Sequence, residues 1–220
     1  MKKLIFTLLT LAFLLPAAAQ RTPVKSHEWA FMGLEAGSGA NWFQVSEPYS
    51  RSGFGFGDFF VGMHMEFLFG NRQQHGIFVN EGVQWLKGKF KSTEYDGQVS
   101  GKVINLYVRP GYKYTFRNAM FIEVYPQLDI PMNPTITDPH VNNPREYTPP
   151  ATDKQAIGFG VGAGWGYNFS DNLAMVMRLT QSFTNMFDGD RADTYGEWFS
   201  PGACKGNLMF EMGFILGFGL

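Results

Sequence analysis

Residues 156–169, AIGFGVGAGWGYNF, carry a glycine at every second position from Gly158 to Gly166. The intervening residues are apolar or aromatic. A period of two indicates a β-strand, because successive side chains on a strand point to opposite faces. Glycine weakens a strand, so five in register indicate that bulky neighbours crowd the bare face. We therefore expect a strand in the wall of a narrow transmembrane β-barrel. Its lumen-facing glycine stripe would be Gly158, Gly160, Gly162, Gly164 and Gly166.

The composition supports a membrane-embedded β-structure. Charged residues make up 17% of the chain and aromatic residues 16%, yet no apolar stretch after the N-terminal segment approaches the length of a membrane-spanning helix. This combination fits membrane-facing residues that are spread over alternating strands.

The first nineteen residues, MKKLIFTLLTLAFLLPAAA, have the parts of a cleaved signal peptide: two lysines, an apolar run and small residues before Gln20. The apolar run is too short for a transmembrane helix. We expect a signal peptide at 1–19 and one outer-membrane β-barrel domain at 20–220. Removing two lysines leaves 16 Lys+Arg against 19 Asp+Glu, a balance that gives no case for a nucleic-acid partner. Cys204 is the single cysteine and cannot form an internal disulfide.

Alternating apolar and polar residues predict eight strands. They cover 28–38, 57–69, 76–90, 102–116, 120–130, 156–169, 172–185 and 205–220. The gaps between them alternate between long ones, led by 131–155, and short ones, such as the turn near Arg117. Long extracellular loops and short periplasmic turns are typical of outer-membrane barrels. The predicted fold is all-β, an eight-stranded antiparallel up-and-down transmembrane β-barrel with both chain ends in the periplasm.

A soluble eight-stranded barrel with its apolar faces inward is the alternative fold. It would leave a solvent-facing surface of bare glycines and would pack Trp165, Tyr167, Phe210, Phe214 and Phe218 into one small lumen. The membrane barrel avoids both problems.

Three local features conflict with regular alternation. Glu81 falls on the face of apolar neighbours, and a β-bulge could move it to the other face. Pro110 and Pro126 fall on apolar faces of neighbouring strands, where we expect a bulge or irregular pairing. The even-numbered residues of both these strands are apolar, which favours a three-residue loop or a bulge in the turn between them.

Several segments resemble a known family. The AAAQ cleavage region, the glycine-alternating strand, the downstream NLAMVMRLTQSFTN and the alternating final strand resemble the small outer-membrane barrels of Bacteroidetes-type bacteria, often grouped as PorT-like. They are similar in architecture to OmpX and the barrel of OmpA. The resemblance implies the outer membrane of a Gram-negative bacterium. The chain departs from it at Leu220, where such barrels often end in phenylalanine.

Ionisable residues on the inward faces predict a polar network in the lumen. Its members are Glu35, Asp58, His64, Glu66, Arg109, Lys113, Glu123, Asp129, Arg178 and Glu211. An eight-stranded barrel is just wide enough to be filled by side chains, so we expect these charges to pair in a structural plug. A narrow channel or porin for small solutes is the alternative.

Aromatic residues mark the predicted membrane interface and candidate binding loops. Tyr112, Tyr114, Trp165 and Tyr167 would form an aromatic girdle at the periplasmic interface. Loops 39–56, 131–155 and 186–204 carry further aromatic residues, among them Phe43, that could contact a surface or envelope protein. The other expected partners are outer-membrane lipid and lipopolysaccharide.

The sequence offers no constellation for catalysis. No histidine or serine falls on the predicted lipid face of a strand, His64 points inward and His75 lies in a periplasmic turn. No metal-ligand cluster and no cofactor motif is present. A lipid-modifying outer-membrane enzyme therefore remains only an alternative to a structural or surface-binding barrel.

Overall fold

A computed structural model describes residues 30–45, 49–53, 55–70, 74–92, 98–137, 146–147, 157–184, 186 and 204–219. The predicted signal peptide at 1–19 lies outside these residues. The strands are β1 (Ala30–Val45), β2 (Tyr49–Gly53), β3 (Gly55–Phe69), β4 (His75–Ser92), β5 (Gln98–Thr115), β6 (Met120–Thr137), β7 (Glu146–Tyr147), β8 (Gly158–Asn168), β9 (Leu173–Ser182) and β10 (Cys204–Gly219). The described part contains no helix that is long and apolar enough to cross a membrane.

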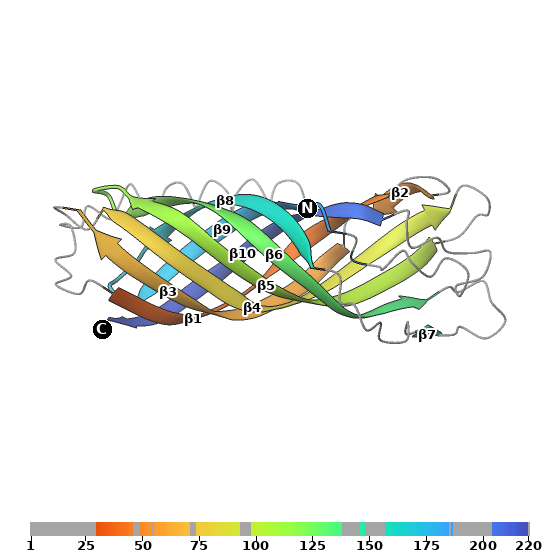
Figure 1. Ribbon diagram of the computed structural model, residues 1–220, viewed down its shortest axis with the longest axis horizontal. Coiled ribbons are helices and arrows are strands. Elements are labelled where there is room, and N and C mark those ends of the chain that lie inside the picture. Colours follow the sequence, from red (N-terminus) through yellow and green to blue (C-terminus); the bar gives the residue numbers. More distant parts are fainter. Residues whose placement is uncertain are drawn as a thin grey trace, which may run out of the picture.

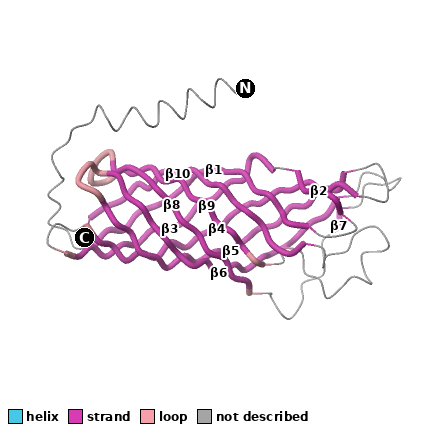
Figure 2. The backbone as a smooth tube through the Cα atoms, turned by 90° about the horizontal axis from the view of Figure 1, so that it is seen from above, coloured by secondary structure: helices cyan, strands magenta, loops and turns pink. Residues whose placement is uncertain are grey.

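Eight long strands close into a barrel (Figures 1 and 2). The circuit runs β1–β3–β4–β5–β6–β8–β9–β10, and β10 returns to β1 in one register from Phe31 opposite Gly219 to Gln44 opposite Gly206, with a shift before Val45 opposite Cys204. Every pairing is antiparallel. The short β2 and β7 pair with β4 and β6. The predicted all-β, eight-stranded antiparallel barrel is confirmed.

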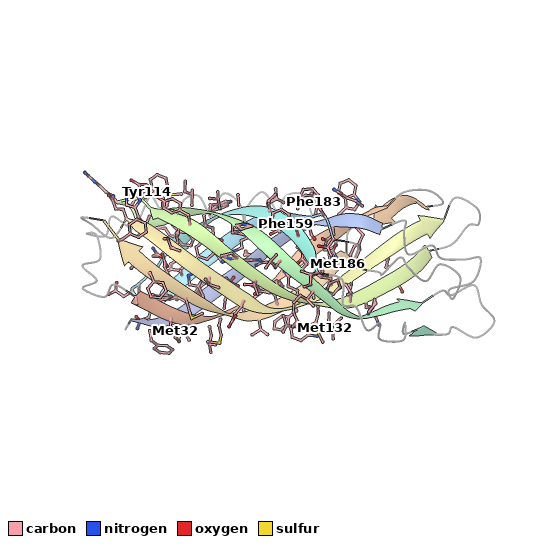
Figure 3. All side chains as sticks on the ribbon, viewed as in Figure 1. Met32, Tyr114, Met132, Phe159, Phe183 and Met186 are labelled. Carbon is pink, nitrogen blue, oxygen red and sulfur yellow. The ribbon has the colours of Figure 1, made fainter. Side chains whose placement is uncertain are left out.

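The barrel is apolar outside and polar inside. Exposed and buried residues alternate along the strands, so that Phe210, Met212, Phe214 and Leu216 face outward while their neighbours are buried. Met32, Phe159 and Phe183 likewise project from the outer surface in Figure 3. On β4 the outward apolar residues run from Ile77 to Trp85, which is nine residues and matches the roughly 9–11 that a transmembrane strand needs. This largely apolar exterior excludes the soluble alternative.

The wall of the barrel is uneven. β4, β5 and β6 each have 18 residues, whereas β8 has 11 and β9 has 10. The connections from β3 to β4, from β5 to β6 and from β8 to β9 are short, and short turns are typical of the periplasmic end of such barrels. The long strands therefore project at the extracellular end, together with β2 and β7 (Figure 1).

The strands also extend further than the sequence pattern predicts. Residues 39–45 continue β1, and Tyr49–Gly53 form β2, so the predicted loop 39–56 is largely strand. β6 likewise runs to Thr137 into the predicted loop 131–155. Above the membrane neither face of a strand contacts lipid, so the outward residues need not be apolar. The alternation of apolar and polar residues that identifies a strand in the sequence is therefore lost there.

The two prolines interrupt the sheet without shifting it. The β5–β6 ladder stops after Val108–Leu128 and resumes at Tyr112–Val124 in the same register. Pro110 and Pro126 fall between these pairs, so the expected irregular pairing is present, but no bulge accompanies it. The following turn is the predicted three-residue loop, closed by a 2.7 Å bond from Phe116 N to Met120 O. Its last residue, Ala119, has φ 65°.

Glu81 stays on the outer face. β4 pairs with β3 and β5 without a register shift, which places Glu81 opposite Met63 and Val108 and exposed. The predicted bulge is therefore wrong at this position. An acidic side chain lies in the middle of the lipid-facing band.

We expect Glu81→Leu to stabilise the barrel by about 1–2 kcal/mol, because it removes a carboxyl group from the lipid face, where charged groups are costly. Unfolding in urea, followed by gel mobility in phospholipid vesicles, measures the change. Val83→Leu is the matched control, because it enlarges an apolar residue on the same face and is expected to have little effect. A Glu81→Leu protein no more stable than the parent would contradict the lipid-facing position.

Candidate functional site

The lumen collects every ionisable residue that the sequence pattern places there. Exposed fractions lie between 0% and 6% for Glu35, Asp58, His64, Glu66, Arg109, Lys113, Glu123, Asp129, Arg178 and Glu211. Six acidic side chains share this interior with Arg109, Lys113 and Arg178. Buried charges of this kind require partners, and the contacts supply most of them.

Two arginines organise the middle of the lumen. Arg178 of β9 pairs with Glu35 of β1 and with Glu123 of β6. Asn80 of β4 also donates to Glu35. One guanidinium therefore connects carboxylates from strands on different sides of the barrel.

Arg109 of β5 makes a second set of cross-lumen contacts. Its Nη2 lies 2.8 Å from Glu211 Oε2, and its Nε donates to Gln127 Oε1 over 2.5 Å. The guanidinium carbon lies 4.1 Å from the centre of the Tyr107 ring and 5.5 Å from that of Tyr125. Side chains thus cross the full interior.

The periplasmic half combines one ion pair with an apolar layer. Lys113 pairs with Glu66, and its Nζ lies 4.7 Å from the centre of the Phe121 ring. His64 lies 3.5 Å from Glu66 and stacks on Phe78. The apolar layer consists of Phe31, Phe121, Ala174, Val176 and Ile215.

Neutral donors hold the carboxylate of Asp129. Asn105 and Gln127 donate to its Oδ1 over 2.7 Å and 2.5 Å. Ser182 and Thr184 donate to its Oδ2 over 2.6 Å and 3.1 Å. The sequence prediction covers only ionisable residues and so misses these four neutral partners. Their inward positions in the alternating pattern could have identified them.

The glycine stripe faces the lumen side chains of β6. A Cβ atom built on Gly162 would overlap the ring of Tyr125, one on Gly164 would collide with Glu123, and one on Gly166 with Phe121. The register places these residues directly opposite one another. At Gly158 the crowding side chain is Thr184, and at Gly160 it is the neighbouring backbone. The bare face of β8 thus provides the space that large lumen residues occupy.

The predicted periplasmic girdle is only partly exposed. Tyr112 is 40% exposed, and its hydroxyl lies 2.6 Å from His75 Nδ1. Tyr114 packs edge-on against Phe116, and Trp165 is half-buried. Tyr167 is only 8% exposed and packs edge-on against Phe169. Neighbouring side chains cover much of this girdle.

The predicted positions of two residues are wrong. His75 is the first residue of β4 rather than part of the turn, and it stacks on Phe69 beside Tyr112 at the outer surface. A histidine therefore does lie on the outer face. Phe43 belongs to β1 and is fully buried, with its ring filling the space beside Gly88. The third candidate loop, 186–204, lies outside the described residues except at its two ends.

No group of three or more His, Cys, Asp or Glu side chains that could hold a metal ion occurs among the described residues. A cavity of about 10 Å³ lies beside Asp58, Gln84 and Glu211. A volume of this size holds about one water molecule.

A closed barrel of transmembrane strands, with an apolar exterior and a polar interior, defines an integral β-barrel membrane protein. The chain belongs to the outer membrane protein beta-barrel domain family, whose family model matches residues 5–198. It is therefore a β-barrel protein of the outer membrane of a Gram-negative bacterium.

Several solved structures are similar to this chain at low sequence identity. Ail of Yersinia pestis, solved in complex with the heparin analogue sucrose octasulfate, is 9% identical with a TM-score of 0.49, over 86% of this chain and 99% of Ail. Neisserial surface protein A is also 9% identical, with a TM-score of 0.49, over 86% and 97%. OprG of Pseudomonas aeruginosa is 11% identical, with a TM-score of 0.45, over 90% and 100%. A search of curated proteins found no significant match.

Proposed function

We propose that this protein is a non-conducting, non-enzymatic outer-membrane barrel with a structural or surface-binding role. The observation that carries the proposal is the filled lumen. Arg178 and Arg109 cross-link its middle, and an apolar layer that includes Phe121 and Ile215 fills its periplasmic half. The cavity beside Asp58 is too small to form a solute pathway.

The projecting strands support a role at the cell surface. β2, β4, β5, β6 and β7 extend past the shorter β8 and β9 at the extracellular end (Figure 1). A rigid sheet that carries loops is a suitable scaffold for contacts with a surface or envelope protein. In this proposal the chain is exported through the cleaved signal peptide at 1–19, and it groups with the PorT-like barrels on the pattern of its glycine strand.

The proposal predicts that the folded protein does not conduct ions in planar bilayers, because side chains fill the middle and the periplasmic half of the lumen. Mobility of boiled and unboiled samples on a gel first establishes that the barrel is folded. Current recordings at both polarities then test for conductance. Stable, discrete channels from the folded fraction would contradict the filled lumen and favour the channel alternative.

A further inference from the structure

Three lysines lie together on the outer face of the extracellular half of the barrel. Lys87 and Lys89 occupy successive outward positions of β4, and Lys102 lies on β5. The register places Lys87 directly opposite Lys102. All three side chains are exposed. We call these residues the lysine cluster.

The lysine cluster begins where the lipid-facing band ends. The next outward pair toward the periplasm is Trp85 opposite Ile104, and Trp85 packs against Phe59 with ring centres 5.5 Å apart. Aromatic side chains are typical of membrane–water interfaces. The nine residues Ile77–Trp85, whose outward side chains are apolar except for Glu81, separate the cluster from the periplasmic interface. The ammonium groups therefore lie at the level of the outer-leaflet headgroups.

No ion pair among the described residues neutralises the cluster. Asp58 on the neighbouring strand accepts a 2.9 Å bond from the backbone nitrogen of Lys87, but its side chain is buried inside the barrel. Glu81 lies six residues from Lys87, about 20 Å along the strand. Like charges directly opposite each other destabilise a sheet, so an anion from outside the protein would relieve the repulsion between Lys87 and Lys102.

We propose that the lysine cluster binds the phosphate groups of lipopolysaccharide in the outer leaflet. Ammonium groups bind phosphate as point charges, and the phosphates of lipid A are the anionic groups at this level of the membrane. The adjacent Trp85 and Ile104 provide the apolar surface along which acyl chains pack. This continuity with the lipid-facing band favours a lipid over a soluble polyanion. The inference rests on the outer-membrane location and is independent of whether the lumen conducts.

Energy transfer from the native tryptophans to dansyl-labelled lipid A tests the proposal. The protein is folded in phosphatidylcholine vesicles that contain increasing amounts of the labelled lipid. A lysine near an anionic membrane surface contributes about a fivefold change in affinity, so the variant Lys87→Gln/Lys89→Gln/Lys102→Gln is expected to bind lipid A about a hundredfold more weakly. Unlabelled bis-phosphorylated lipid A is expected to displace the probe, and dephosphorylated lipid A to displace it far less.

Arg117→Gln is the matched control, because it removes an exposed cation from the periplasmic turn. It is expected to leave lipid A binding unchanged, and gel mobility shows whether each variant is folded. Wild-type affinity in the folded triple variant would overturn the proposal. Equal displacement by the dephosphorylated lipid would overturn it too, as would stronger displacement by a soluble sulfated polysaccharide than by phosphorylated lipid A.

Discussion

Gly162→Phe is expected to prevent the barrel from folding, whereas Ala163→Phe is expected to fold with nearly the yield of the parent. A side chain at position 162 would overlap the ring of Tyr125, which is buried and bonded to Thr180 over 2.8 Å. Tyr125 also packs edge-on against Phe78, so a ring introduced beside it is expected to cost more than the roughly 1–3 kcal/mol of ordinary overpacking. Ala163 is exposed on the outer face, where phenylalanine meets lipid.

Refolding into detergent or vesicles, followed by the folded fraction on unboiled gels, measures both variants. The pair is well matched because the same residue is introduced at adjacent positions of one strand. Similar folded yields would show that the bare face of β8 does not point into a packed lumen. A further variant, Gly162→Phe with Tyr125→Ala, is expected to recover part of the yield, since it removes the ring that the introduced phenylalanine would strike.

Arg178→Met is expected to destabilise the barrel by about 3–5 kcal/mol, because it leaves two buried carboxylates, Glu35 and Glu123, without their cation. Both acids are almost completely buried. Unfolding in urea, measured by tryptophan fluorescence and gel mobility, gives the change in free energy. Arg117→Met is the control, because its side chain lies exposed in a turn and its loss is expected to cost less than about 0.5 kcal/mol.

Neutralising the two acids distinguishes the loss of charge pairing from the loss of packing. Arg178→Met combined with Glu35→Gln and Glu123→Gln is expected to recover much of the lost stability, since amides carry no charge that needs a partner. If the triple variant is no more stable than Arg178→Met, the guanidinium acts mainly by filling space. If Arg178→Met matches the parent, the central network contributes little to stability.

Alternation alone predicts the transmembrane part of the fold. Within the lipid-facing band each strand must place apolar residues outside and polar or small residues inside, so a period of two is required by the membrane. The same parity identifies the inward set, including Glu35 on β1 and Arg178 on β9. Strands that are consecutive in sequence pair with each other in antiparallel fashion, and this determines the order of the strands in the barrel.

Outside the lipid-facing band the outer face of a strand need not be apolar, and the predicted strand bounds and inward positions fail there. Residues 132–137 of β6 include Pro134 and carry a loop-like pattern, although β5 pairs with Met132 and with residues 135–137. Phe43 falls in a predicted loop because the alternation of β1 fades before the strand ends, so its inward position is not recognised from the pattern. The hydrogen-bond partners of Asp129 depend on contacts across the lumen between β5, β6 and β9, which no single strand pattern reveals.

The uneven wall makes the protein directional within the plane of the membrane. The strands that project, β4 to β6, are consecutive in the wall of the barrel, and the shorter β8 and β9 follow them directly (Figure 1). A large particle that approaches the cell surface from the side of β4 to β6 meets the longest strands, whereas from the side of β8 and β9 it meets the shortest ones. The orientation of the barrel about the membrane normal therefore determines which neighbouring proteins can also contact a partner bound to the projecting strands. If copies cluster in the membrane, their projecting strands face either the same direction or each other.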